Sequence, residues 1–203
     1  MTGATKARRA SLGFCAHSGW ACAILLADAN GDVEVIDRRR IALHDPKIPA
    51  SMQPYHEAES MTLASAQSYI ARCETATRRL ASRALIDLHN VARDRSLKLA
   101  GVCILAAPGP ALPDLKSILA SRALIHAAEG ELYRDALVRA CEAEKLPVRR
   151  IEEQQAAYRT ARYLQIDETA LRARLARFGK ALGPPWGTDE KAAATAAWLV
   201  LAA

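Results

Sequence analysis

The sequence is poor in aromatic residues and contains no hydrophobic run long enough to cross a membrane. Phe, Trp and Tyr together make up 5% of the 203 residues. No apolar stretch approaches the ~18 residues that a transmembrane helix requires, so we expect neither an integral membrane protein nor a membrane partner. Hydrophobic residues nevertheless make up 51% of the chain and charged residues 25%, which excludes a disordered chain. At this length the core needs no disulfide or metal to support it.

Several sequence motifs of enzymes and metal sites are also missing. There is no Walker A loop, GxGxxG, HExxH or GxSxG, so the sequence identifies no cofactor. The cysteines form no CxxC pair and their number is odd, which argues against a disulfide framework and against a paired zinc site. They lie in apolar segments, so we interpret them as buried thiols and predict a reducing, cytoplasmic compartment. They are Cys15, Cys22, Cys73, Cys103 and Cys141.

The charge balance is mildly basic. The chain has 28 Lys and Arg against 22 Asp and Glu, a net charge of +6. A basic excess favours nucleic acid or another phosphate-bearing partner because binding releases counterions, although a compositional bias is sufficient to explain an excess of this size. Lys6, Arg8 and Arg9, with no hydrophobic signal-peptide segment behind them, predict a flexible basic N-terminus over residues 1–10. We expect residues 11–203 to form a single domain.

Five short apolar segments predict β-strands. Residues 12–16 and 20–27 are apolar throughout, which is typical of strands covered on both faces. The turn cluster at 28–32 leads into a third strand, as in a hairpin. Two further strands are expected at 99–106, followed by Ala-Pro-Gly-Pro, and at 146–151. The first three strands are therefore expected to be antiparallel.

Helices are predicted between and after these strands. Apolar residues recur every three or four positions over 60–95, a stripe longer than a usual globular helix, which predicts a break near Ser82. Further helices are expected at 115–145, 153–164, 168–178 and 188–202. This order predicts an α/β fold with a mixed five-stranded sheet, three antiparallel strands followed by two parallel ones, and helices on both faces.

Three stretches carry a resemblance to a known family of folds. Residues 12–28 (LGFCAHSGWACAILLAD), 118–151 and 187–202 (GTDEKAAATAAWLVLA) resemble the first hairpin, the helix with the fifth strand, and the closing helix of the ribonuclease H-like superfamily. Within it the layout is most similar to that of RuvC-type Holliday-junction resolvases. The resemblance spans most of the chain but is one of topology. It implies a nuclease centre in which carboxylates from strand one, strand four and the last helix hold two metal ions.

The sequence departs from that family at two of these three places. The end of strand one offers Cys15 and His17 where an Asp would be expected, and strand four ends without an acid. Only the last helix carries carboxylates, Asp189 and Glu190, which are therefore the candidate metal ligands. The resemblance then implies a ribonuclease H-like fold from which most catalytic acids are missing.

We expect a binding cleft where the turn after strand one meets the end of strand four and the start of the last helix. His17 is a candidate general base and Ser18 a candidate donor to phosphate or carboxylate, although an ordinary hairpin turn explains both. His56, next to Tyr55 after a proline-rich loop, is a second candidate, although the acid-rich start of a helix is sufficient to explain this segment. The predicted cleft residues are His17, Ser18, Gly19, His56, Pro108, Gly109, Asp189 and Lys191.

Arginines gather in two regions that are candidates for nucleic-acid contact, one at the end of the third strand and one on the late helices. Solvated strand and helix faces are the alternative interpretation. The candidate residues are Arg38, Arg39, Arg40, Arg172, Arg174 and Arg177.

Three functional hypotheses follow. The first is a catalytically degenerate RuvC-like domain that binds a ligand, nucleic acid or a partner protein. The second is a Mg²⁺- or Mn²⁺-dependent nuclease or phosphotransferase that uses displaced acids, Glu57 and Glu59, together with Asp189 and Glu190. The third is a dimeric interaction protein that pairs through the 60–95 helix.

Overall fold

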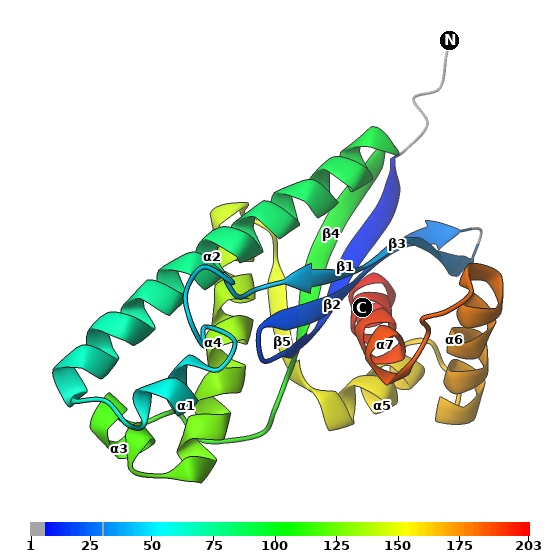
Figure 1. Cartoon of the computed structure of the whole chain (residues 1–203). Coiled ribbons are helices and arrows are strands. Elements are labelled where there is room, and N and C mark those ends of the chain that lie inside the picture. The colour runs from blue at the N-terminus through cyan, green and yellow to red at the C-terminus, as the bar shows by residue number, and fades with distance from the viewer. Residues whose placement is uncertain (1–6, 30) are drawn as a thin grey trace.

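The computed structural model describes residues 7–29 and 31–203, which form a five-stranded sheet between two groups of helices (Figure 1). Residues 1–6 of the expected basic N-terminus lie outside the described residues, whereas Arg8 and Arg9 already belong to the first strand. The elements in chain order are β1 (Arg8–His17), β2 (Trp20–Ala29), β3 (Asp32–Ala42), α1 (Pro54–Ala58), α2 (Leu63–Asp94), β4 (Leu97–Ala106), α3 (Leu115–Leu119), α4 (Arg122–Ala143), β5 (Val148–Glu152), α5 (Glu153–Tyr163), α6 (Glu168–Leu182) and α7 (Thr188–Ala202).

The sheet has the order β3-β2-β1-β4-β5. β1 pairs antiparallel with β2, and β2 with β3, whereas β4 runs parallel to both β1 and β5. This confirms the expected mixed sheet of three antiparallel strands followed by two parallel ones. Because β1 lies in the centre and pairs with strands of both directions, its C-terminal end is where the hairpin and the parallel half of the sheet meet.

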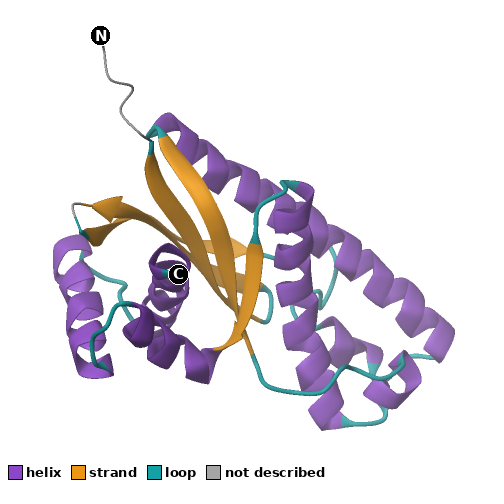
Figure 2. Cartoon of the chain, turned by 180° about the vertical axis from the view of Figure 1, so that it is seen from behind, coloured by secondary structure: helices purple, strands orange, loops and turns teal. Residues whose placement is uncertain are grey.

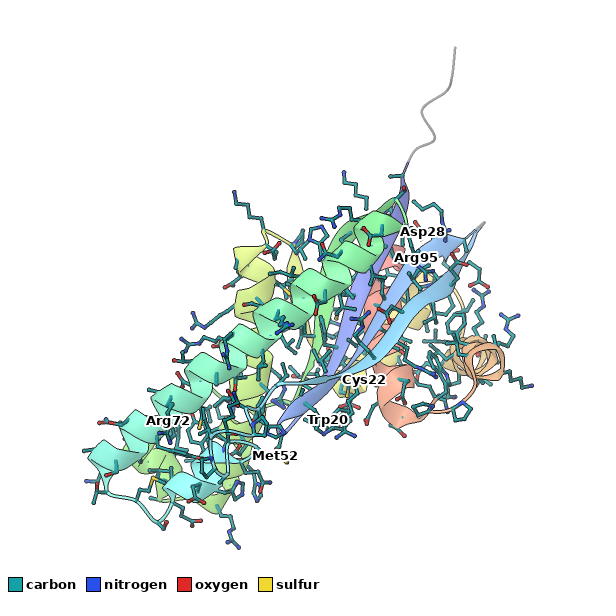
Figure 3. All side chains as sticks on the ribbon, turned by 45° about the horizontal axis from the view of Figure 1, so that its top comes forward. Trp20, Cys22, Asp28, Met52, Arg72 and Arg95 are labelled. Carbon is teal, nitrogen blue, oxygen red and sulfur yellow. The ribbon has the colours of Figure 1, made fainter. Side chains whose placement is uncertain are left out.

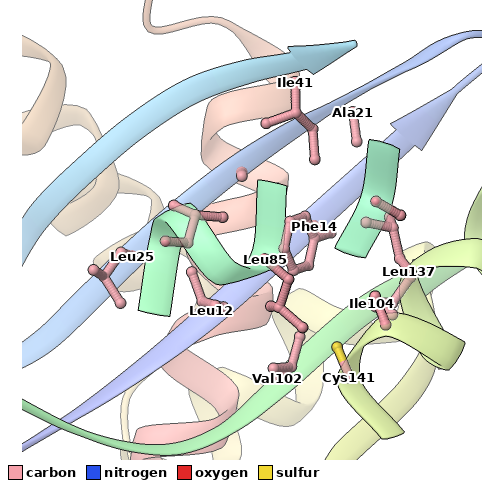
Figure 4. Close-up of a cluster of buried hydrophobic side chains, with 14 of the residues drawn as sticks. Leu12, Phe14, Ala21, Leu25, Ile41, Leu85, Val102, Ile104, Leu137 and Cys141 are labelled. Atoms are coloured by element: carbon pink, nitrogen blue, oxygen red, sulfur yellow. The ribbon is translucent and has the colours of Figure 1, made fainter. Parts of the chain in front are cut away.

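The central strands β1 and β2 are buried on both faces of the sheet, which explains their uninterrupted apolar runs. One face packs against α2 and α4 and contains Leu12, Phe14 and Leu85 (Figure 4). The opposite face packs against α5, α6 and α7 and contains Ile24 and Trp198. The two helical groups lie on opposite sides of the sheet when it is viewed from behind (Figure 2). Each fully buried large apolar side chain contributes about 1.5–3 kcal/mol.

The helix α2 continues for 32 residues without the predicted break near Ser82. Its apolar stripe continues past that point, because Ala81, Leu85 and Leu88 are all buried on the same side of the helix. The segment contains neither glycine nor proline, the residues that most readily interrupt a helix. Conversely, the expected helix over 115–145 is divided into α3 and α4, with Ser121 at the N-cap of the second.

The described part of the chain contains no helix that combines the length and the apolar character needed to span a bilayer. The longest helix, α2, carries arginines along its outer face, among them Arg72 and Arg78. The final helix α7 is the most apolar one, but it has 15 residues and lies buried against β1 and β2.

Candidate functional site

A cleft lies outside the C-terminal ends of the parallel strands β1, β4 and β5, the position at which ligands bind in open α/β sheets. It consists of two adjoining hollows of about 540 Å³ and about 800 Å³. Pro108 and Arg134 line both hollows. Cys15 and Glu153 line the first one, and Arg150 lines the second.

Three side chains with metal-ligating atoms meet at one end of this cleft. His17 Nε2 lies 3.1 Å from Asp189 Oδ1 and 3.6 Å from Cys15 Sγ. Cys15 Sγ lies 4.0 Å from Asp189 Oδ1. Cys15 is buried, whereas His17 and Asp189 are partly exposed, so the cluster is accessible from solvent. Among the residues that the structure describes, this is the one group of three or more His, Cys, Asp or Glu ligand atoms in mutual reach.

The close approach of α7 to β1 brings this cluster together. Every second residue of β1 faces α7, because side chains alternate between the two faces of a strand. These residues are Ser11, Gly13, Cys15 and His17. The Ser11 hydroxyl donates to the carbonyl oxygen of Ala197 at 2.7 Å. Gly13 has no side chain to separate the two backbones, so α7 lies directly on the strand. The first turn of α7, which carries Asp189, is thereby fixed beside the end of β1.

The ring of His17 is oriented by stacking. It lies parallel to the ring of Trp20, its cross-strand partner in the β1–β2 hairpin, with 4.4 Å between centroids. The guanidinium of Arg40 lies over the Trp20 ring, 3.6 Å from its centroid. Figure 3 shows Trp20 and Cys22 side by side near this end of the sheet. The imidazole is therefore held with Nε2 toward Cys15 and Asp189.

Burial raises the pKa of the Cys15 thiol to about 12, and the negative charges of Glu153 and Asp189 act in the same direction. Burial also raises the pKa of Cys22, its direct cross-strand partner, to about 12. Both thiols are therefore protonated at neutral pH in the absence of a bound cation. Neither behaves as a free thiolate nucleophile, which requires a lowered pKa.

The predicted cleft residues divide between several places. His17 and Asp189 come together as described, and Pro108 lines both hollows of the cleft while Gly109 lines the second. Ser18 and Gly19 form the β1–β2 turn, where Gly19 has a φ of 79°. The turn serves the fold, because the Gly19 carbonyl accepts a hydrogen bond from the Leu43 amide at 2.8 Å.

His56 and Lys191 lie apart from this cluster. His56 belongs to α1, where its Nδ1 is 3.4 Å from Glu129 Oε1 and its ring meets that of His126 edge-on. Lys191 is exposed on α7 and lines a separate shallow hollow with Trp186. The chain thus brings two of its predicted cleft residues into one chemical cluster and distributes the others along the cleft or beyond it.

The other candidate acids have different positions. Glu190 Oε2 accepts a hydrogen bond from the amide of the N-cap residue Gly187 at 2.7 Å, at the start of α7. This interaction engages one oxygen of the Glu190 carboxylate, and Glu190 does not belong to the cluster of Cys15, His17 and Asp189. Glu57 is exposed on α1 and Glu59 directly follows that helix, which packs against α2 and α4. Figure 1 shows α1 far from α7, on the other side of the sheet.

The arginines at the end of β3 have separate partners. Arg38 donates to the carbonyl oxygen of Gly183 at 2.9 Å and so holds the loop before α7. Arg39 pairs with Asp37, and Arg40 is exposed on the ring of Trp20.

The arginines of α6 also contact neighbouring side chains. Arg172 lies 3.6 Å from Glu168, one turn away, and Arg177 lies 3.9 Å from Asp32. Arg174 lies over the ring of Trp198, 6.0 Å from its centroid. These contacts account for their positions without a ligand, so Arg40 is the member of the predicted basic set that faces solvent nearest to the cluster.

Three residues of the site were missed by the sequence analysis as functional candidates. Cys15 was interpreted as a buried thiol because a zinc motif with paired spacing is absent. Arg134 and Glu153 border the cleft, but each lies in a segment that is separated from Cys15 by more than a hundred residues. The sequence does place Cys15 and His17 on the same face of one strand, two positions apart. Because Cys22 falls on the next strand and no fourth ligand lies nearby in the sequence, this pair alone did not predict a metal site.

The two-magnesium centre that the resemblance implies does not fit these residues. Magnesium prefers oxygen ligands in an octahedral arrangement. Here the end of β1 supplies a thiol and an imidazole, and β4 ends in Ala106 followed by Ala107 and Pro108. The cluster therefore contains one carboxylate, that of Asp189.

No protein-family model matches the chain, and no curated protein is significantly similar to it in sequence. Its structure is similar to that of Thermus thermophilus RuvC, with a TM-score of 0.52 and 11% identity over 94% of this chain and 92% of that chain. T. thermophilus RuvC in complex with Holliday junction substrate is similar to the same degree, with a TM-score of 0.52 and 11% identity over 94% and 91%. The chain therefore has a ribonuclease H-like, RuvC-like fold, as its sequence predicts.

Proposed function

We propose that this chain is a RuvC-like domain that binds nucleic acid in the cleft beside β1 and lacks two-metal nuclease activity. The observation that carries the proposal is the position of Arg134. Its side chain is 13% exposed and lines both hollows of the cleft. A guanidinium in such a place is suited to a phosphate group.

The charge of Arg134 is only weakly compensated within the described residues. Its nearest carboxylate, that of Glu131, lies at 4.0 Å. Glu131 is engaged by Arg150 through two contacts, of 2.6 Å and 2.7 Å. Burial lowers the pKa of Arg134, because the charged guanidinium has lost part of its hydration. An anion bound in the cleft would offset this cost by pairing with the charge.

A second cation stands on the sheet beside the cluster. Arg40 is exposed, and the ring of Trp20 beneath it is held on its other side by His17. A guanidinium that is oriented in this way loses less side-chain entropy when it binds a phosphate. The net charge of +6 adds a general attraction for a polyanion. That T. thermophilus RuvC was solved with a Holliday junction makes a branched DNA a suitable first probe.

The alternative of a nuclease with displaced acids has less support. Glu57 and Glu59 would have to cross from the α2 and α4 side of the sheet to reach Asp189.

The alternative of a dimer formed through α2 also has less support. The outer face of this helix carries Arg72 and Arg78, and its large exposed apolar side chains are Leu63 and Ile86 at distant turns.

The proposal is tested by titrating fluorescently labelled single-stranded, duplex and four-way-junction DNA with the protein at several salt concentrations. We expect binding that weakens steeply with salt, with a dissociation constant at or below ~10⁻⁴–10⁻⁶ M at physiological salt. The Arg134→Gln variant should bind more weakly and with a salt slope reduced by about one. Arg139→Gln is the matched control, because Arg139 is exposed on the same helix and pairs with Asp135.

Two results would overturn the proposal that the chain binds DNA without cleaving it, and a third would overturn the location of the binding site in the cleft. One is that none of the three DNAs binds, or that binding does not depend on salt. The other is that Mg²⁺ or Mn²⁺ produces strand cleavage that Asp189→Asn abolishes, which would favour the nuclease. If Arg134→Gln and Arg139→Gln weaken binding equally, the cleft is not the binding site even where DNA does bind.

A further inference from the structure

We propose that Cys15, His17 and Asp189 bind a single divalent transition-metal ion, for which zinc is the best match. This site differs in ligand chemistry from the two-magnesium centre that the fold resemblance implies. It does not rest on the proposal of nucleic-acid binding, because the three ligand atoms belong to the cluster whatever occupies the cleft.

The spacing of the three ligand atoms is close to that required by tetrahedral zinc. With the usual Zn–S, Zn–N and Zn–O bond lengths, neighbouring ligand atoms lie about 3.4–3.6 Å apart. In the protein the separations are 3.6 Å between Cys15 Sγ and His17 Nε2, and 3.1 Å between His17 Nε2 and Asp189 Oδ1. The third, between Cys15 Sγ and Asp189 Oδ1, is 4.0 Å. Shifts of a few tenths of an ångström would therefore suffice to place an ion between them.

The ligands stand on rigid parts of the fold, which lowers the cost of ordering them. Cys15 and His17 belong to the central strand, and Asp189 belongs to the first turn of α7. The stacking of His17 on Trp20 already directs Nε2 toward the other two ligand atoms. A metal site assembled from strand and helix positions is more precisely defined than one assembled from loops.

Three protein ligands leave a fourth tetrahedral position for water or a ligand atom. Cys15 lines the hollow of about 540 Å³, so the cluster borders the cleft. Glu153 and Arg134 line the same hollow. Three ligands with one position open is the arrangement of catalytic zinc sites, whereas structural sites use four protein ligands.

The ligand types select the class of metal. Thiolate and imidazole favour zinc and its neighbours in the transition series, whereas magnesium favours carboxylates and water. Metal binding displaces the thiol proton of Cys15, as happens whenever a cysteine becomes a ligand. Zinc, or cobalt as its spectroscopic substitute, should therefore bind in preference to magnesium.

The test uses the full chain, freed of metal with a chelator and then titrated with zinc, with cobalt and with magnesium. We expect one zinc ion per chain, and a cobalt complex with a thiolate-to-cobalt charge-transfer band and the strong visible absorption of tetrahedral cobalt. His17→Gln and Asp189→Asn should lose tight zinc binding. Cys15→Ala should lose both zinc binding and the charge-transfer band. Circular dichroism of each variant checks the fold.

Cys22→Ala is the matched control, because Cys22 faces Cys15 across the hairpin yet does not belong to the cluster. It should retain the zinc stoichiometry and the cobalt spectrum. The partly exposed His17 keeps the test decisive even if Cys15→Ala fails to fold. Zinc binding that survives His17→Gln and Asp189→Asn, a cobalt spectrum without thiolate, or magnesium binding tighter than zinc would overturn the proposal. Loss of DNA binding in these experiments would not affect it.

Discussion

Gly13 in β1 lies so close to Ala193 in α7 that a Cβ atom on Gly13 would stand 1.9 Å from the Ala193 carbonyl oxygen. The same Cβ would stand 2.5 Å from the amide nitrogen of Ala197. Both contacts are with helix backbone, which cannot turn aside as a side chain can. The absence of a side chain at this position therefore sets the distance between the central strand and the helix that carries Asp189.

Gly13→Ala should destabilise the protein by about 3 kcal/mol, because the helix must move away from the strand or the strand must bend. Chemical denaturation measures this change. The control is Gly109→Ala, for which the structure shows no atom within 4 Å of the new Cβ. The control should change the free energy of unfolding by no more than about 0.5 kcal/mol. Equal effects of the two substitutions would contradict the role given to Gly13.

The architecture of the sheet could be predicted because its signals are local. Apolar runs marked β1, β2 and β4, and the turn residues from Asp28 to Asp32 marked the hairpin between β2 and β3. The length of α2 could not be predicted in the same way. The helix continues past Ser82 because the sheet and α4 bury its apolar residues on both sides of that position. This burial is a property of the tertiary fold and not of the local sequence.

The site was only half predictable for the same reason. Cys15 and His17 are two positions apart, so their common face follows from strand geometry. Asp189 joins them from a helix that begins more than 170 residues later in the chain, and the contact depends on the close packing of that helix on Gly13. Glu129 gave a different signal, a carboxylate next to Ala128 on the buried face of α4, and the sequence analysis did not use it.

Tyr133→Phe should destabilise the protein by about 1 kcal/mol, because it removes a buried hydrogen bond. Tyr133 is fully buried, and its hydroxyl lies 2.8 Å from the carbonyl oxygen of Ser51 and 2.9 Å from that of Met52. Tyr158→Phe is the control, since Tyr158 is 53% exposed and should be neutral. Thermal and urea unfolding of both variants measure the difference. If Tyr133→Phe proves as neutral as Tyr158→Phe, the hydroxyl does not anchor the loop before α1.

Gly130→Ala should stabilise the protein and weaken DNA binding at the same time. A Cβ on Gly130 would lie 2.6 Å from Arg134 Nη1, at the mobile end of a long side chain that can move. The helix then gains up to about 1 kcal/mol from the better helix former, while the guanidinium leaves its place in the cleft. Denaturation and DNA titration on the same sample measure the two effects. Unchanged DNA affinity would show that the position of Arg134 is irrelevant to binding.

The two oxygens of the buried Glu129 carboxylate differ in their hydrogen bonding. Oε1 accepts hydrogen bonds from the amides of Tyr55 at 2.6 Å and His56 at 3.2 Å, and lies 3.4 Å from His56 Nδ1. Oε2 has no hydrogen-bond partner among the described residues. Burial raises the pKa of Glu129 above its ordinary value of 4.5, although these hydrogen bonds and the charge of His56 oppose the shift. The folded protein therefore binds a proton at Glu129 more tightly than the unfolded chain does.

The direction of this shift predicts how stability depends on pH. A raised folded-state pKa gives a stabilising contribution that is complete below pH 4.5 and is lost as the pH rises through the folded-state pKa. The unfolding free energy of the wild type should therefore fall relative to that of Glu129→Gln as the pH rises over a range that begins near 4.5. Urea unfolding at intervals across this range measures the difference. Glu142→Gln, which changes an exposed carboxylate on the same helix, should show no such trend. A difference that stays constant, or grows in favour of the wild type as the pH rises, would show that the hydrogen bonds to Oε1 outweigh the burial of the charge.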